Sequence, residues 1–459
     1  MSEVKVNKIS PRSGTTVTLG DSGDTFTIPS GATINNQGTA TNFGATGSAS
    51  WETTVKTASF TAVAGEGYFV DTNGGAITVS LPAGSAGAVV AVKDYRNTFD
   101  TNNCTISPNG SDKIGGSTKD VILSAEGIAI TLVFVDSTRG WLVTDSGLQS
   151  EASQPISAEF LLIAGGGSGG VHNGAGAGAG GLRTSFGSTS GGGASAESNL
   201  SLNPGTQYTI TIGGGAAAVT TDQSPGVQGN NSSISGSNIT TITCIGGGAG
   251  GGAEASTAGG NGGSGGGGGN YTNGAAGSGT SGQGFAGGAG NSPQDLGGGG
   301  GAGAVGQDGS DGNYGGAGGA GLQVDIDGNN YYWAGGGGGA AYETGDAAGA
   351  GGIGGGGGGT GGNGASGGAG GGSGLNSGGT GDAEAQSGGT AGSGGTNTGS
   401  GGGGKSRGPG GASGAGGSGI AIIRLATSDY TGTVTGSPTV ATSGSDTIIT
   451  FLGDGTYTA

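Results

Sequence analysis

Short runs in which apolar and polar residues alternate recur through the first third of the chain, separated by glycine and asparagine. This period of two is that of a β-strand with one buried face, and the intervening glycines mark turns. Within residues 1–50 each run is too short to bury much surface alone. We therefore predict a β-stem or attachment segment at residues 1–50, stabilised by stacking or by wrapping around symmetry-related chains. The runs are Thr16–Leu19, Thr25–Ile28 and Thr33–Asn35.

Residues 51–150 carry longer alternating runs that are rich in Val, Ile, Phe and Tyr, the residues that β-sheets favour. Turn signals such as Asn73-Gly74-Gly75 and Pro108-Asn109-Gly110 lie between them. This spacing predicts a small all-β module, a sandwich or a barrel, with the most conventional core in the chain. The expected strands are Ser59–Val63, Gly67–Val70, Ile77–Leu81, Ala88–Val92, Ile128–Val135 and Trp141–Val143.

Strand-like apolar runs frame a long glycine-rich region. Residues 151–245 open it with runs such as Glu159–Ala164 and predict a β-scaffold, and residues 420–459 close it with β-strands. Nearly half of residues 246–419 are glycine. A flexible linker would need neither framing strands nor the Tyr, Phe and Trp residues found between the glycine runs. We therefore predict that residues 246–419 form a folded glycine-rich array that displays loops.

The glycine runs suit one kind of ordered packing. Glycine loses more backbone freedom on folding than any other residue, so main-chain hydrogen bonds and close backbone contacts must offset that cost. The polyproline II helix has three residues per turn and no internal hydrogen bonds, which leaves its N–H and C=O groups for neighbouring helices. A polyglycine II bundle predicts nearly pure glycine inside and Ala, Ser, Thr or Asn on solvent faces. Collagen is excluded because glycine does not occupy every third position.

Polar and aromatic inserts interrupt the glycine runs and are expected at the ends of the bundle. Tyr and Asn at exposed loop tips are residues that rigid recognition surfaces favour. Seven residues in these inserts are therefore candidate receptor-binding positions. They are Tyr271, Asn273, Asp295, Tyr314, Tyr342, Glu343 and Asp346.

Charge and hydropathy exclude several classes of function. No window of ten or more residues has helical spacing of apolar residues, so we expect an all-β protein with essentially no α-helix. The net charge of −17 argues against a nucleic-acid surface, which needs clustered Lys and Arg. No run approaches the roughly 20 apolar residues that span a bilayer, and Met1–Val6 lacks a signal-peptide pattern. An extracellular role would then require another exit route, such as release inside a virion by host lysis.

The cysteines and the single histidine have simple interpretations. Cys104 and Cys244 lie far apart in β-like stretches without metal-ligand spacing, which favours buried free thiols over a disulfide. His172 is followed by Asn173-Gly174, so we interpret it as an exposed loop residue rather than a catalytic base. No sequence feature brings two carboxylates together as a polysaccharide-degrading enzyme requires. We predict no enzymatic activity and no cofactor.

Asp325 and Asp327 have the spacing of a calcium-binding loop. However, the sixth position of that loop is Asn330 rather than Gly, and no Glu follows at the twelfth position. Strand-like residues flank the segment on both sides, so an Asp-Gly hairpin is favoured. We predict no metal site.

The second half of the chain carries strand and glycine motifs in a distinctive order. Phe160–Gly167 opens the series and Gly416–Arg424 closes it. Between them lie Ala175–Thr184, Pro204–Gly213, Gly229–Ser233 and Tyr332–Gly337. The series, over roughly residues 158–459, resembles the glycine-rich domain of bacteriophage tail fibre and adhesin proteins. Thr27–Ile34 resembles, more loosely, the stems of marine phage tail proteins.

This resemblance implies an elongated, homotrimeric fibre in the virion tail. It implies a bacterial surface receptor, either a glycan or an outer-membrane protein, bound through the distal inserts, and attachment to other tail proteins through the N-terminal segment. The chain differs from a stand-alone tip adhesin because a stem and a β-module precede its glycine-rich part. Three interpretations stay open: a receptor-binding fibre, a structural spacer without receptor binding, and a depolymerase.

Overall fold

The computed structural model describes residues 49–145, 155–253, 258–269, 274–291, 295–310, 315–383, 389–408 and 410–459, together with Ser13, Thr15 and Val17. Apart from Val17, the three strands predicted within residues 1–50 therefore lie outside the described residues. The described residues form an all-β protein whose helices are two 3-10 turns, Gly191–Gly193 and Thr427–Asp429. The expected absence of α-helix is confirmed for this part of the chain. Neither of these turns has the length of a membrane span.

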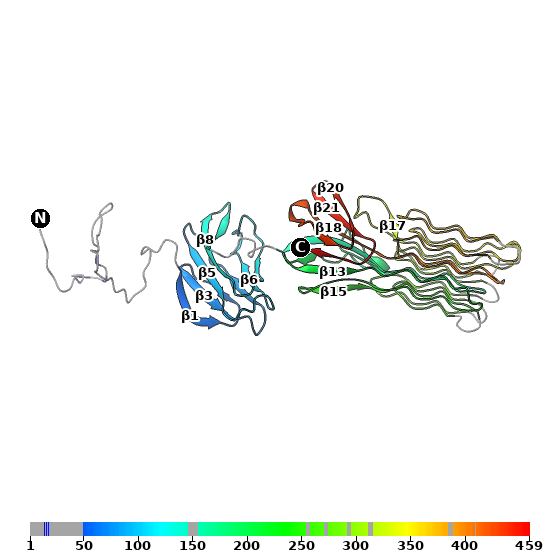
Figure 1. The fold of residues 1–459 in the computed structure, drawn as a ribbon, viewed down its shortest axis with the longest axis horizontal. Helices are drawn as coiled ribbons and strands as arrows, with labels where there is room; N and C mark the ends of the chain where they lie inside the picture. The colour runs from blue at the N-terminus through cyan, green and yellow to red at the C-terminus, as the bar shows by residue number, and fades with distance from the viewer. Residues whose placement is uncertain are drawn as a thin grey trace.

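Residues 50–145 form a module of two sheets, drawn in blue to cyan (Figure 1). Successive strands alternate between the sheets up to β6, so the pairs β1–β3, β3–β5, β2–β4 and β4–β6 run parallel. One sheet has the order β1-β3-β5-β8-β9, with β1 (Ser50–Lys56), β3 (Glu66–Val70), β5 (Val89–Asp94), β8 (Ala129–Asp136) and β9 (Gly140–Asp145). The other has the order β2-β4-β6-β7, with β2 (Phe60–Thr61), β4 (Ile77–Ser80), β6 (Cys104–Ser107) and β7 (Val121–Leu123).

The core of this module lies between its two sheets. Trp141, Phe99 and Leu81 are among its fully buried side chains. The turn signal at Asn73–Gly75 joins β3 to β4, so it marks a crossing between sheets and not a hairpin. Cys104 is buried here as a free thiol, and Cys244 is buried and free in the second half of the chain, as predicted.

Two further sheets pack around a second core in residues 156–459. In the first, β10 (Ile156–Ile163) pairs along most of its length with β18 (Ile420–Ala426), so strands that flank the glycine-rich region in sequence are neighbours in space. This sheet also contains β11 (Leu182–Thr184), β12 (Leu200–Leu202), β20 (Thr439–Ser443) and β21 (Asp446–Phe451). The second has the order β15-β14-β13-β22-β19, with β13 (Gln207–Thr211), β14 (Ser232–Gly236), β15 (Ile239–Cys244), β19 (Thr433–Thr435) and β22 (Gly455–Thr458).

A short hairpin occupies the segment with calcium-like spacing. β16 (Leu322–Gln323) pairs antiparallel with β17 (Tyr332–Trp333). Gly328 turns the chain with a φ of 86°, and its N–H donates to the Asp325 carbonyl at 2.9 Å. The predicted Asp-Gly hairpin is therefore confirmed. Arg424 of β18 donates to the Ile326 carbonyl at 3.2 Å, which holds the hairpin against the first sheet.

Extended glycine-rich segments lie side by side and project from these sheets (Figure 1). The segment Gly174–Gly181 lies inside this array, and its successive N–H groups donate in rotation to three neighbouring segments. Every third residue therefore meets the same neighbour. Three other segments donate to its carbonyl groups, so it has six neighbours, joined by hydrogen bonds of 2.7–3.2 Å. The neighbours are residues 164–170, 245–251, 264–267, 297–300, 337–340 and 399–405.

The composition of this inner segment differs from the expectation of nearly pure glycine. Ala175, Ala177 and Ala179 are fully buried in it. The glycines between them have no such space, because a Cβ on Gly178 would lie 2.1 Å from the carbonyl oxygen of Ser264. The array therefore accepts methyl groups at some interior positions and excludes them at others, according to which neighbouring backbone the Cα faces.

Candidate functional site

The array has two chemically different ends. We call the end next to the sheets proximal and the opposite end distal. The chain leaves β10, reaches His172 and Asn173 at the distal end and returns through Gly174–Gly181 to β11. Other described turns gather at the distal end because their flanking segments run beside this one or beside its neighbours. They are Thr220–Gln223, Tyr342–Asp346, Gly362–Gly364 and Ser406–Gly408.

Three of the seven candidate binding residues, Tyr271, Asn273 and Tyr314, lie outside the described residues. Asp295 has only 9% of its surface exposed, and its main chain exchanges two hydrogen bonds with Asn291, which close the loop between them. Asp295 therefore lies at the base of a loop and not at its tip.

The other three candidates share one distal turn. Tyr342 and Asp346 are half-buried and Glu343 is exposed. The N–H of Asp346 donates to the carbonyl of Glu343, and the N–H of Glu343 donates to the carboxylate of Asp346, both at 3.0 Å. The carboxylate of Asp346 therefore helps to shape its own turn.

The structure adds residues that the sequence prediction did not include. The guanidinium carbon of Arg407 lies 5.1 Å from the centre of the Tyr342 ring, within the range of a cation–π contact. Thr344 donates to the carbonyl of Asn363 at 2.7 Å, which ties the turn of Tyr342 to the next distal turn. The sequence contains a feature that could have identified Arg407, because Lys405 and Arg407 are the only Lys and Arg within residues 246–419.

His172 lies at the same end. As predicted it belongs to a loop, but it is half-buried, and its Nδ1 is 2.9 Å from a carboxylate oxygen of Asp222. The contact joins the turns at residues 172–173 and 220–223. His172 thus fastens two distal turns to each other.

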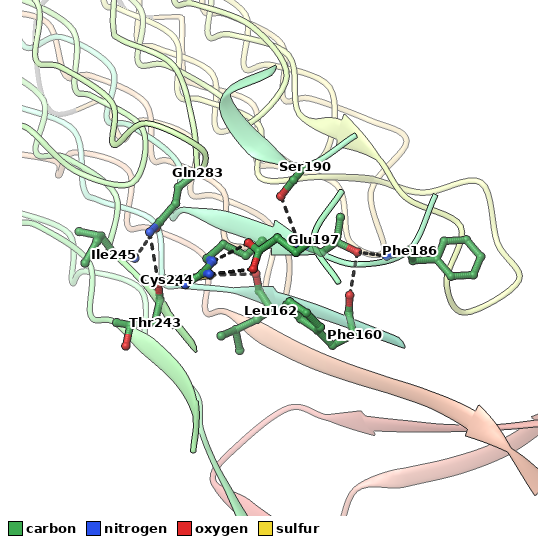
Figure 2. Close-up of polar contacts among 11 residues, drawn as sticks. Phe160, Leu162, Phe186, Ser190, Glu197, Thr243, Cys244, Ile245 and Gln283 are labelled. Carbon is green, nitrogen blue, oxygen red and sulfur yellow. Dashed lines mark hydrogen bonds and ion pairs between the residues drawn. The ribbon is translucent and has the colours of Figure 1, made fainter. Parts of the chain in front are cut away.

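The proximal end is anchored by a polar network (Figure 2). Arg183 of β11 forms two contacts of 2.7 Å with Glu197 and also donates to the carbonyl of Thr243. This hydrogen bonding to Glu197 raises the pKa of the Arg183 guanidinium. Gln283 accepts from the N–H of Ile245 at 2.8 Å and donates to Thr243 at 3.2 Å. The network ties the proximal turn at Gln283 to strands of both sheets.

Cys244 lies in the same region, and its thiol is in an environment that makes it unreactive. Its thiol donates to the carbonyl of Leu162 at 3.1 Å, and burial raises its pKa well above the ordinary value (Figure 2). A thiol held in its protonated form is a poor nucleophile and metal ligand. Among the described residues no three His, Cys, Asp or Glu side chains are grouped so that they could hold a metal ion.

No protein-family model matches the chain, and no curated protein matches it either. The chain's own residues and geometry are therefore the basis for its function. The distal turns bring together aromatic, basic and acidic side chains, among them Tyr342, Arg407 and the pair His172–Asp222.

Proposed function

We propose that this chain is a receptor-binding protein of a bacteriophage tail fibre, in which a polyglycine II bundle presents distal loops to a bacterial surface receptor. The observation that carries the proposal is the six-neighbour array around Gly174–Gly181, with its polar and aromatic turns collected at the end away from the sheets. A spacer needs no such collection of side chains.

The rotation of hydrogen-bond partners supports the polyglycine II assignment. A helix with three residues per turn directs every third N–H group to the same side, and it has no internal bonds to satisfy those groups. The described hydrogen bonds of Gly174–Gly181 follow this period. The assignment also accounts for the composition, because close approach of six backbones leaves room for little beyond hydrogen at many Cα atoms.

A rigid array suits receptor binding. Loops that are already held in place lose less conformational entropy when they bind, so more of the contact energy appears as affinity. At the distal end, the bonds from Thr344 to Asn363 and from His172 to Asp222 connect turns that are far apart in sequence. Tyrosine suits such a surface because its ring packs on apolar faces and its hydroxyl forms hydrogen bonds.

The test is binding of the labelled full-length protein to a panel of bacterial strains, including the host of a phage that encodes it. We expect binding to few strains and its loss in a Tyr342→Ala, Thr344→Ala double variant. The matched control is Tyr95→Ala, which removes a tyrosine that is 50% exposed in the β-module. Equal loss in both variants would refute the assignment of the distal end.

Two other outcomes separate the alternative functions. No binding to any strain, including that host, would favour a structural spacer in the fibre. Release of reducing sugar from host polysaccharide would show a depolymerase. The trimeric state implied by the resemblance is part of the proposal, and sedimentation equilibrium of the full-length protein tests it.

A further inference from the structure

Arg407 has an unusual environment at the distal end. Its side chain is half-buried over the ring of Tyr342, and its Nε is buried without a hydrogen-bond partner. A buried donor left without an acceptor costs about 1–3 kcal/mol, and more when the group is charged. A ligand that supplied the acceptor would remove this cost.

Three other arginines, Arg96, Arg183 and Arg424, have acidic partners, whereas Arg139 is exposed and forms no ion pair among the described residues. Arg96 contacts Asp71 at 2.7 Å, and Arg424 contacts Asp446 at 2.9 Å. Arg407 forms no ion pair within the described part of the chain, although residues 246–419 contain ten acidic residues and only two basic ones. A guanidinium kept from carboxylates in so acidic a region is available to an anion from outside.

Hydrogen bonds from neighbouring residues hold the turn that carries Arg407. Lys405 is 2% exposed, and its ammonium donates to the carbonyls of Ser406 and Gly408 at 3.2 and 2.9 Å, which fixes the turn that carries Arg407. The N–H of Ser406 donates to the hydroxyl of Thr360 at 2.7 Å.

Gly362 brings the two sides of this site together. A Cβ there would lie 2.4 Å from the Ser406 hydroxyl and 2.9 Å from the Tyr342 ring. The turn that carries Arg407 and the turn that carries Tyr342 are therefore in close contact through a glycine, and the two side chains are held in a fixed relationship.

We propose that Arg407 and Tyr342 form a subsite for the carboxylate of an acidic sugar in the bacterial receptor. This inference rests on the proposed receptor-binding function and names its ligand class. The planar guanidinium matches a carboxylate with two parallel hydrogen bonds. The tyrosine ring offers an apolar face and a hydroxyl to the sugar that bears the carboxylate.

The charge around the site favours a carboxylate over a phosphate. Glu343 and Asp346 lie on the same turn as Tyr342. Their repulsion acts more strongly on a dianion than on a single negative charge. The net charge of −17 likewise means that the protein as a whole repels polyanions. Binding of an acidic sugar therefore depends on direct hydrogen bonds from the guanidinium of Arg407.

The test measures binding of the full-length protein to immobilised bacterial glycans that are carboxylated, neutral or phosphorylated, with the host's own surface polysaccharide and its carboxyl-reduced form included. We expect binding to the carboxylated forms only. Arg407→Gln should weaken that binding at least tenfold, and Arg407→Lys should weaken it less. Arg139→Gln, which removes an exposed arginine of the β-module, should leave it unchanged. The thermal midpoint of each variant checks that folding is intact.

Each outcome decides the question. Binding that survives carboxyl reduction, prefers phosphorylated glycans or is unaffected by Arg407→Gln overturns the carboxylate subsite. If whole-cell binding persists in Arg407→Gln while glycan binding is absent, the receptor-binding function stands and the subsite is wrong. If the wild-type protein binds no cell and no glycan, both proposals fail.

Discussion

Gly176 and Gly337 lie in neighbouring segments of the array, and a Cβ on Gly176 would stand 2.0 Å from the carbonyl oxygen of Gly337. In the same pair of segments, the N–H of Gly337 donates to the carbonyl of Ala177 at 2.9 Å. The absence of a side chain at Gly176 is therefore a requirement for direct backbone contact. Gly176 is one of the positions where a methyl group would require the neighbouring backbone to move.

Gly176→Ala is expected to destabilise the protein strongly. Its Cβ would meet main-chain atoms of a segment with hydrogen bonds on several sides, and overpacking of a tight interior costs about 1–3 kcal/mol or more. Urea unfolding, followed by a probe in the second half of the chain, measures the effect.

Gly372→Ala is the matched control for this substitution. Gly372 lies in the same array, but a Cβ there would meet nothing within 4 Å. We expect its free energy of unfolding to stay within about 0.5 kcal/mol of the wild type. Similar behaviour of the two variants would mean that backbone contact in the array does not determine stability.

Glu197→Gln is expected to weaken the anchor at the proximal end. Arg183 and Glu197 have side-chain exposures of only 27% and 29% and are joined by two short contacts, so loss of the charge removes more than a surface ion pair would. We expect a loss of about 1–2 kcal/mol in urea unfolding. Arg96→Gln breaks a pair whose arginine is 58% exposed and should cost less than about 1 kcal/mol. The reverse order would contradict this account of the anchor.

The stability of the β-module should fall at alkaline pH. Burial, followed by the charge of Asp94, raises the pKa of Cys104 from its ordinary 9.0 to about 12. The unfolded thiol therefore ionises first, and stability that is complete below pH 9 is lost as the pH rises from 9 towards 12. Burial also raises the pKa of Tyr68 to about 12, which acts in the same direction.

Urea midpoints measured between neutral pH and the alkaline range test this linkage. Cys104→Ala should begin less stable because it leaves a small cavity, but it should lose less stability over the same alkaline range. A parallel decline in the variant and the wild type would exclude Cys104 as a source of the pH dependence.

The strands of the second half were predictable because their apolar runs are continuous. Glu159–Ala164 gave the position of β10 to within a few residues, and β18 opens the segment 420–459, for which closing strands were predicted. Their pairing with each other was not predictable, since nothing local records which strand lies beside which. The same limit applies to the β-module, where alternation predicted most strands but not their parallel order across two sheets.

The candidate site was predictable only in part. Aromatic and polar inserts pointed to Tyr342, Glu343 and Asp346, which share a turn. Arg407 meets Tyr342 from another segment, so only the packing of the array brings the pair together. Conversely, Asp295 looked like a loop-tip residue, but its hydrogen bonds with Asn291 close the loop at its base.

Calcium is expected to leave the protein unchanged. Asp327 accepts from the N–H of Asn329 at 3.0 Å and from its side-chain amide at 3.2 Å, so both carboxylate oxygens serve the turn. The thermal midpoint should be the same in calcium and in a chelator. A midpoint that rises with calcium in the wild type but not in Asp327→Asn would reveal a metal site in this hairpin.

Hydrogen exchange should distinguish an ordered array from a flexible glycine linker. The N–H groups of Gly174–Gly181 each donate to a neighbouring segment, whereas a linker's amides would be bonded to water. Exchange of a bonded, buried amide requires opening of the structure, so this segment should be protected to a degree close to that of β10. Mass spectrometry of peptides from the exchanged protein measures both regions in one experiment, with the urea-unfolded protein as the reference. If residues 174–181 exchange as fast as in the unfolded reference while β10 remains protected, the sheets are folded but the array is not, and a rigid display of the distal turns is ruled out.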